Sequence, residues 1–322
     1  MSPVIERHLL ARLRARHLEL LVALADTLSI HRAAARLHMT QPAASKSLRE
    51  LETLFGTRLF DRHPRGLQPT AATQIVIDRA RIMLTEMRKL GSDLALLANG
   101  AQGKVRVGIM PVAIPDFLPR VLALMSEDAP HVVMEFHEGA IDWMLGGLAQ
   151  GKLDCIVCRL GDATAAAPFC REPLFEEGVC IVARRKHPLA RRKAVTPAML
   201  ASAGWIFPGG DAPLRTAIRQ FFADNLVPAP IPKVECVSVL ANLQILQDTD
   251  WLAFLPRPIA LQYQALGVLT ILNAPDKWPM PAVGLVTRAE THQTPALEAF
   301  GRAARRAGSK LANTPSPIPL AK

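Results

Sequence analysis

Long hydrophobic runs are missing from this 322-residue sequence, in which no stretch approaches 18 consecutive apolar residues. A transmembrane helix needs about 20 such residues, so we expect no membrane span and no membrane partner. Residues 1–16 carry four arginines but no apolar segment long enough for a signal peptide. We therefore expect a cytoplasmic protein.

Motifs for catalysis or cofactor binding are also scarce. The five cysteines are scattered and odd in number, which argues against a disulfide framework. Cys155 and Cys158 lie three apart on a predicted strand, so they point to opposite faces, and no second pair follows at zinc-finger spacing. There is no His-Glu-x-x-His arrangement, and no Gly-x-Gly-x-x-Gly follows the first strand. We expect no metal, no cofactor and no enzyme activity.

Positive charge, in contrast, is in excess, and its distribution is uneven. The net charge is +10. Residues 1–100 hold 15 Lys and Arg against 9 Asp and Glu, whereas the remaining residues hold 23 against 19. This indicates a polyanionic partner, double-stranded DNA, bound by the N-terminal third. The length suits two or three domains, and a hydrophobic content of 50% is ample for their cores.

The pattern over residues 15–72 predicts a winged helix-turn-helix. Residues 17–26 form the first helix, Ser29 caps a short second helix, and Thr40 caps a third that Gly56 ends. Residues 57–69 then read as a basic β-hairpin, the wing. Residues 1–14 are expected to be a flexible basic arm.

A recognition helix presents polar side chains near its N-terminus to the major groove. Gln41 suits adenine, and Lys46 or Arg49 suits a guanine edge or a phosphate. The alternative is an ordinary three-helix domain with a solvated basic face. The candidate DNA-contacting residues lie on the caps, the third helix and the wing: Ser29, Thr40, Gln41, Pro42, Ser45, Lys46, Arg49, Arg62, Arg65 and Thr70.

A long helix is predicted over residues 71–98, and residues 73–99 are assigned as a linker and dimerisation helix. Its apolar residues are spaced alternately by four and three, which is typical of a coiled-coil seam. A core-facing amphipathic helix is the alternative. The seam comprises Val76, Ala80, Met83, Met87, Leu90, Leu94 and Leu97.

From residue 103 to 311, short apolar strands alternate with helices, which predicts an α/β domain with parallel sheets. Subdomain I would comprise residues 103–160 and 268–308, and subdomain II residues 164–267. Residues 312–322 are expected to be a disordered tail. Strands are expected at 105–109, 132–136, 153–157, 179–183, 205–207, 233–237, 251–254, 268–272 and 282–286.

Ligands of such folds bind outside the carboxyl ends of the strands. Backbone amides that follow the first strand suit a carboxylate or a sugar hydroxyl. Arg159 and Arg257 follow strands and suit an anion, although each is equally consistent with a surface arginine. The candidate effector-binding residues all lie at strand ends: Met110, Pro111, Val112, Arg159, Phe207, Gly209, Val239, Phe254 and Pro256.

The segment from Leu28 to Glu52 resembles the helix-turn-helix of the LysR-type transcriptional regulators, and the segment from Gly56 to Arg62 resembles the wing of that family. The resemblance extends over residues 15–308. It implies an α/β fold class: an N-terminal winged helix-turn-helix, a long linker helix, and two Rossmann-like subdomains similar to a periplasmic binding protein.

The resemblance also implies a phosphate contact from Thr70, a homodimer through the linker helix and a homotetramer through side-by-side α/β domains. This chain departs from the family at the end of the wing. The family usually has Leu-Thr followed by two residues and Gly, whereas this chain has Pro69, Thr70 and, at the glycine position, Thr73.

We therefore expect a sequence-specific transcriptional regulator controlled by a small-molecule effector, either a sugar or an organic or aromatic acid. Closure of the subdomains around the effector would change the spacing of paired helix-turn-helix units. One alternative is a ligand-independent DNA-binding protein whose α/β domain only oligomerises. An enzyme with a DNA-binding appendage is the other alternative, and the missing catalytic motifs argue against it.

Overall fold

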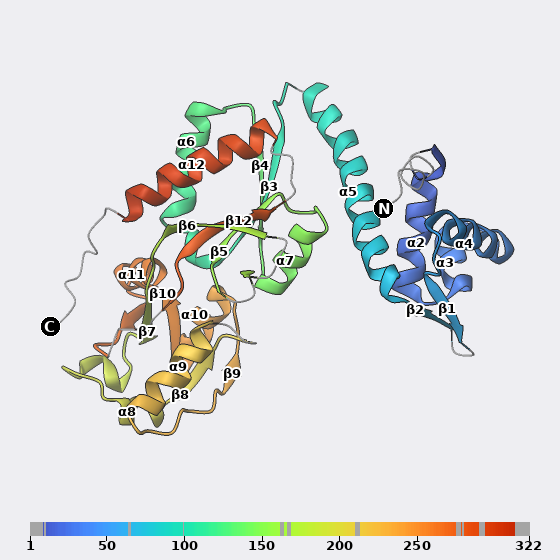
Figure 1. Ribbon diagram of the computed structural model, residues 1–322. Helices are drawn as coiled ribbons and strands as arrows, with labels where there is room; N and C mark the ends of the chain where they lie inside the picture. Colours follow the sequence, from blue (N-terminus) through green and yellow to red (C-terminus); the bar gives the residue numbers. More distant parts are fainter. Residues whose placement is uncertain are drawn as a thin grey trace. The chain divides into compact units, whose positions relative to one another are not determined.

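The computed structural model describes residues 9, 11–63, 66–98, 100–161, 164–165, 169–209, 213–274, 278, 280–289 and 294–312. It divides into two compact units (Figure 1). The first unit comprises Met1–Gly100 with Ala149–Lys152, and the second comprises Ala101–Leu148 with Leu153–Lys322. Over the described residues, no helix is long and apolar enough to cross a membrane.

The first unit is a winged helix-turn-helix followed by a long helix. Its elements are α2 (Ala15–Thr27), α3 (Ile30–Arg36), α4 (Gln41–Phe55), the antiparallel hairpin β1 (Phe60–His63) and β2 (Gly66–Pro69), and α5 (Ala71–Ala98). Ser29 and Thr40 cap α3 and α4 as predicted, and Gly56 ends α4 with a φ of 67°, a left-handed conformation that glycine adopts readily. Ala33 and Ala34 are buried, so α3 packs closely beside its neighbours.

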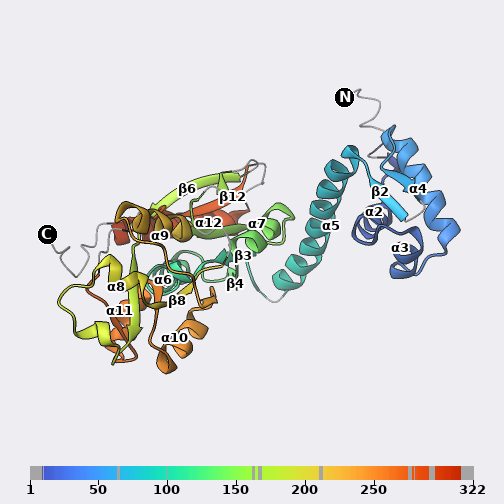
Figure 2. The ribbon, with the colours of Figure 1, turned by 90° about the horizontal axis from the view of Figure 1, so that it is seen from below.

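Helix α5 has two differently buried parts. In its first half, Ala80 and Leu84 pack against Leu18 of α2, and Arg81 forms an ion pair with Asp26 of α2 at 2.7 Å. Figures 1 and 2 both show α2 beside this part of α5. From Met83 onward, the helix also carries a stripe of exposed large apolar side chains: Met83, Met87, Leu90, Leu94 and Leu97. The core-facing interpretation therefore holds for the first half, and the predicted seam is an exposed stripe only from Met83 onward.

The predicted N-terminal arm is partly structured. Leu9, Ala11 and Arg12 are helical, and Leu13 packs against the small cluster of Leu18, Ala80 and Leu84. Residues 1–8, Leu10 and the predicted tail from residue 313 lie outside the described residues.

Subdomain I is built on a five-stranded sheet with the order β4-β3-β5-β12-β6. Helices α6 and α12 cover one face with a large apolar core, and α7 covers the other. Figure 1 shows α6 and α12 side by side. The elements are β3 (Lys104–Ile109), α6 (Phe117–Asp128), β4 (Val133–Glu138), α7 (Ile141–Ala149), β5 (Cys155–Arg159), β6 (Phe169–Phe175), β12 (Val283–Arg288) and α12 (Pro295–Ala312), with a 3-10 turn, η1 (Pro111–Ala113).

Subdomain II is built on a second sheet with the order β11-β7-β10-β8-β9. Strand β6 thus belongs to the sheet of subdomain I and β11 to that of subdomain II, the reverse of the expected bounds, because each strand lies directly before the chain passes to the other subdomain. Helices α8 and α9 contribute to the core on one face, and α10 and α11 to the core on the other. The elements are β7 (Val179–Arg184), a 3-10 turn, η3 (Pro188–Arg191), α8 (Pro197–Ala201), β8 (Gly204–Phe207), α9 (Pro213–Asp224), β9 (Val234–Glu235), α10 (Val239–Asp248), β10 (Trp251–Pro256), α11 (Arg257–Ala265) and β11 (Leu269–Ile271).

The predicted parallel pairing holds for three strands of each sheet, and the remaining strand pairs are antiparallel. Strands β3, β4 and β5 are parallel, and so are β8, β9 and β10, but β12 runs antiparallel to β5 and β6, and β7 runs antiparallel to β10 and β11. The chain passes from one subdomain to the other twice, between β6 and β7 and between β11 and β12, and we call these two connections the chain crossings. The antiparallel strands β7 and β12 each directly follow a chain crossing. Strand β6 was missed because it is an edge strand with three exposed residues and Pro173, which an edge tolerates.

Candidate functional sites

Helix α4 has one buried face and one exposed polar face. Ala44, Leu48 and Leu51 are buried against α2 and α3. Lys46 and Arg49 are exposed on the rest of the helix, and so are Thr40, Gln41 and Pro42 at its N-terminal end. This arrangement suits an N-terminal end that enters a major groove.

The polar residues of α4 are partly held by contacts within the helix. The Nε of Arg49 donates to the carbonyl oxygen of Ser45 at 3.4 Å, and Ser45 is half-buried. Lys46 lies 3.9 Å from Glu50, one turn on, and both are exposed. Such surface pairs are weak, so the Lys46 ammonium is available to a phosphate. The cap hydroxyls of Ser29 and Thr40 each accept a backbone N–H of their own helix, from Arg32 and Ala43.

Glu52 connects helix α4 to the wing, a contact that no local sequence pattern indicates. Its Oε1 accepts the backbone N–H groups of Leu59 at 2.9 Å and Phe60 at 3.2 Å, where the wing begins. This carboxylate therefore fixes the start of β1 against α4. Arg65 and the side chain of Arg62, both predicted DNA contacts, lie outside the described part of the wing.

The end of the wing is closed by two threonines. The Thr70 hydroxyl donates to the carbonyl oxygen of Arg58 at 3.0 Å, and the Thr73 hydroxyl donates to that of Leu59. The backbone N–H of Thr70 donates to the Thr73 hydroxyl at 3.0 Å. Thr73, which stands at the usual glycine position of the family, is buried. Its hydroxyl thus joins the first turn of α5 to the wing.

Of the predicted effector-binding residues, three belong to hydrophobic cores. Val112 is 5% exposed and packs in the core of subdomain I. Phe207 and Phe254 lie against Trp205 in subdomain II, with ring centroids 5.4 and 5.0 Å from it. These three side chains are therefore parts of the cores and not lining residues of an open site.

The other predicted residues are half-buried at strand ends. Met110 follows β3, and its backbone N–H donates to Val157 of β5 at 3.0 Å, with Pro111 next to it in η1. In subdomain II, Gly209 follows β8, Val239 begins α10 and Pro256 ends β10. They come from the carboxyl ends of strands in both subdomains, as such ligand sites require.

Arg159 is the predicted residue that joins the two subdomains. It ends β5 and is 8% exposed. Its Nη1 donates to the carbonyl oxygens of Glu177 at 2.8 Å and Pro281 at 3.1 Å, one on each chain crossing. Its Nη2 is buried without a hydrogen-bond partner among the described residues. Burial lowers the pKa of Arg159 to about 10, against the opposing effect of Glu177, so the guanidinium stays charged.

Glu177 lies within electrostatic range of three charged residues, Arg159, Arg257 and Asp116. The backbone N–H of Arg257 donates to Gly178 at 3.1 Å, and its buried Nε has no partner in the described chain. Burial raises the pKa of the Glu177 carboxyl; the Gly178 backbone N–H, Arg159 and Arg257 lower it, and Asp116 raises it. Two guanidinium and two carboxylate groups are thus close enough to interact. Sequence analysis missed Glu177 and Asp116, which lie in connections rather than at strand ends.

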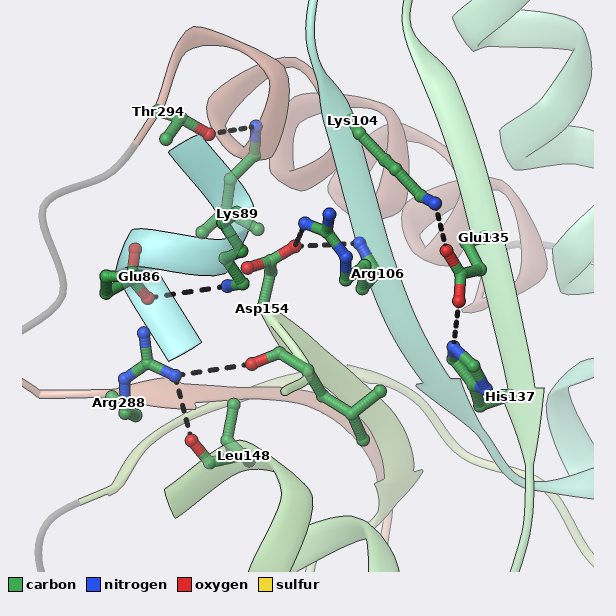
Figure 3. A network of polar contacts seen from close by, with 12 residues as sticks. Glu86, Lys89, Lys104, Arg106, Glu135, His137, Leu148, Asp154, Arg288 and Thr294 are labelled. Atoms are coloured by element: carbon green, nitrogen blue, oxygen red, sulfur yellow. Dashed lines mark hydrogen bonds and ion pairs between the residues drawn. The ribbon is translucent and has the colours of Figure 1, made fainter. Parts of the chain in front are cut away.

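A separate polar network lies near the amino ends of the parallel strands of subdomain I (Figure 3). Lys104 pairs with Glu135, and His137 lies 2.6 Å from the same carboxylate. The hydrogen bond from Lys104 lowers the pKa of Glu135. Asp154, just before β5, accepts the backbone N–H of Arg106 at 2.8 Å. These contacts join neighbouring strands, so we assign them a structural role.

The two cysteines of β5 are the side chains that an enzyme could use as nucleophiles or metal ligands. Cys155 packs in the core beneath α6 and α12, whereas Cys158 packs in the core beneath α7, so the two thiols point to opposite faces as predicted. Burial raises the pKa of Cys158 to about 12, which makes its thiol a poor nucleophile. Within the described residues, no group of three or more His, Cys, Asp and Glu side chains is placed to hold a metal ion.

Two family models match the chain. Residues 15–74 match the bacterial regulatory helix-turn-helix proteins of the lysR family, and residues 98–309 match the LysR substrate binding domain. The chain belongs to the LysR family. It is a DNA-binding transcriptional regulator with an effector-binding domain, not an enzyme.

Curated relatives cover most of this LysR-type chain. The transcriptional regulator GbpR of Azospirillum brasilense is 32% identical over 276 residues, which are 85% of this chain and 81% of GbpR. GalR of Pseudomonas putida is 31% identical over 89% of this chain and 72% of its own. The crystal structure of CbnR bound to its target DNA has the same fold, with a TM-score of 0.63, 21% identity, and coverage of 92% of this chain and 100% of CbnR.

Proposed function

We propose that this LysR-type regulator alters its DNA contacts when a small polar molecule binds beside Arg159, between the strand ends of its two subdomains. The observation that carries the proposal is the buried Nη2 of Arg159, which has no hydrogen-bond partner in the described part of the chain and is a donor that a ligand oxygen would satisfy. The guanidinium already contacts both chain crossings, so a ligand bound to it acts where the subdomains join. Met110, Pro111, Gly209, Val239 and Pro256 would line the site.

The ligand classes we propose are sugars and organic or aromatic acids. Arg159 and Arg257 supply donors that suit a carboxylate, and Glu177 and Asp116 supply acceptors that suit the hydroxyl groups of a sugar. A ligand that carries both an acid group and hydroxyls would satisfy all four side chains.

For the DNA side, we propose that the N-terminal part of α4 reads base edges and that the wing contacts the backbone. Gln41, Ser45 and Arg49 would read bases, and Lys46 and the wing arginines Arg62 and Arg65 would contact phosphates. An operator with two-fold symmetry binds two winged helix-turn-helix units. The exposed apolar stripe of α5 is suited to join two copies of the chain as a homodimer. A homotetramer would follow from pairing of the α/β domains.

A thermal-shift screen with sugars, sugar acids and aromatic acids tests the effector proposal, because a ligand of the native state raises its melting temperature. Arg257→Gln should abolish the shift, whereas Arg192→Gln, at an exposed position of subdomain II, should preserve it. Both variants should bind operator DNA as the wild type does. A shift that survives in Arg257→Gln would place the ligand elsewhere. If no compound of these classes shifts the wild type, the ligand-independent alternative is favoured.

A further inference from the structure

A second cavity lies on the outer part of subdomain I, between strand β6 and helix α12. Its volume is about 480 Å³, within the usual range for small-molecule pockets. Cys170 and Glu172 of β6 pair in register with Thr287 and Leu285 of β12, so these four side chains face the helix together. On the helix side, position 301 is a glycine, which leaves this space open.

The cavity has an apolar floor and a charged rim. Leu285 and Leu297 are both 5% exposed and form the floor. The rim holds Arg171, Arg302 and Arg305 together with Glu172 and Glu298.

One rim pair is already neutral, because the Nε of Arg305 lies 2.7 Å from Glu172. Arg302 is exposed and makes no ion pair with any described residue. Arg171 pairs in register with Val286, which packs in the core on the α7 face, so the Arg171 side chain points away from α12. Arg302 is therefore the guanidinium at the rim that can take up a ligand anion.

We propose that this cavity is a second ligand site, distinct from the one beside Arg159, and that it binds a small aliphatic monocarboxylate. The planar guanidinium of Arg302 can hold one carboxylate through two parallel hydrogen bonds. The alkyl chain then covers Leu285 and Leu297 and removes apolar surface from water. An inorganic anion lacks the apolar part and would leave the floor uncovered.

Cys170 offers a built-in reporter for this site. It is exposed and lines the cavity, whereas Cys155, Cys158 and Cys180 are buried and Cys236 is half-buried in subdomain II. A ligand in the cavity shields the Cys170 thiol from alkylation and leaves Cys236 unaffected, so Cys236 serves as the internal reference.

The test follows iodoacetamide labelling of Cys170 and Cys236 by peptide mass spectrometry in the full-length protein. Millimolar hexanoate should slow labelling of Cys170 several-fold without changing that of Cys236, and the neutral analogue hexanamide should not. Arg302→Ala should abolish the protection. Arg306→Ala is the matched control: Arg306 is the exposed arginine four residues on along α12, paired with Asp128 at 2.5 Å and outside the cavity lining. It should keep full protection.

A second variant fills the cavity instead of removing charge. A Cβ at position 301 would meet only the guanidinium end of Arg305, at 3.7 Å, so a side chain can begin there without a clash, and Gly301→Leu extends such a side chain into the cavity. Hexanoate should no longer protect Cys170 in this variant. Equal labelling rates with and without hexanoate in the wild type would overturn the proposal. Protection that persists in Arg302→Ala, or that hexanamide reproduces, would overturn the assignment of a carboxylate.

Discussion

Glu52 is a single carboxylate on which the position of the wing depends. It accepts two backbone N–H groups, from Leu59 and Phe60, where the chain leaves α4 and enters β1. Glu52→Ala leaves both donors without this acceptor, at a cost of about 1–3 kcal/mol in the free energy of unfolding of the DNA-binding unit. Chemical denaturation followed by far-UV circular dichroism measures the loss. Glu50→Ala, an exposed neighbour, is the control and should change stability little.

Arg49 of α4 carries the exposed guanidinium that we propose reads a base edge. We expect Arg49→Ala to weaken specific operator binding by about 1–3 kcal/mol if it reads a base. Arg120→Ala removes the same charge from an exposed position of α6 and should leave binding unchanged. Gel-shift titrations at a fixed salt concentration measure the operator affinity of both variants and of the wild type. Equal affinity of Arg49→Ala and the wild type would exclude this docking of α4.

The Glu177 carboxyl gives the stability a predictable pH dependence. Because burial raises its pKa in the native state, the native state holds this proton more tightly than the unfolded chain does. Its contribution is therefore complete below the ordinary carboxyl pKa and is lost as the pH rises through the raised value. Relative to the wild type, the melting temperature of Glu177→Gln should therefore rise as the pH increases from about 4, the ordinary carboxyl value, through the raised pKa of the native state.

Glu176→Gln, at the exposed neighbouring position, is the control for this pH series. Its melting temperature should keep a constant difference from that of the wild type. A constant difference for Glu177→Gln as well would show that this carboxyl has the same pKa in the native and the unfolded chain.

At single positions, the sequence predicts correctly those features that depend only on residues nearby in the chain. Ser29, Thr40 and Gly56 were placed correctly because capping and helix termination are local. The surroundings of Arg159 were out of reach, since its partners Glu177 and Pro281 lie 18 and 122 residues away. For the same reason Val112 was taken for a lining residue, although it packs into the core.

Helix α5 combines two burial patterns on one element. Its first half packs on α2, and from Met83 onward it exposes five large apolar side chains that a second copy of the helix would cover. Met87→Asp puts a charge into that stripe and should shift the protein from dimer to monomer in sedimentation experiments at micromolar concentration. Arg88→Asp changes the charge at the adjacent exposed position and should leave the dimer intact. A monomeric wild type would refute dimerisation through α5.

The bounds of helices and strands were predictable where the periodicity of apolar residues is regular over many residues. The range 71–98 expected for the long helix agrees with α5. The start of the third expected strand was wrong, because Leu153 donates its N–H to Gly147 and β5 begins only at Cys155. Strand order was not accessible either, since β12 inserts between β5 and β6 from more than 100 residues along the chain.

The whole molecule has separate hydrophobic cores, and its tryptophans report on only one unit. All four tryptophans fall after residue 100, whereas helices occur in both units. We expect thermal unfolding followed by tryptophan fluorescence to differ in midpoint from unfolding followed by far-UV circular dichroism, because units with their own cores unfold independently. Coincident curves would show that the two units unfold as one cooperative system.

The attachment of α5 to the DNA-binding helices has a mechanical consequence. The Leu18, Ala80 and Leu84 cluster, the ion pair of Arg81 with Asp26, and the hydrogen bond of Thr73 to the wing fasten the helix at its base. Helix α5 and the winged helix-turn-helix therefore move together as one rigid arm. With a rise of about 1.5 Å per residue, 28 residues make an arm of roughly 42 Å. A tilt of about 10° displaces its end by about 7 Å, roughly two base-pair steps of 3.4 Å. In the proposed dimer, small rotations at the far end of α5 are thus enough to move a winged helix-turn-helix into or out of register with its DNA half-site.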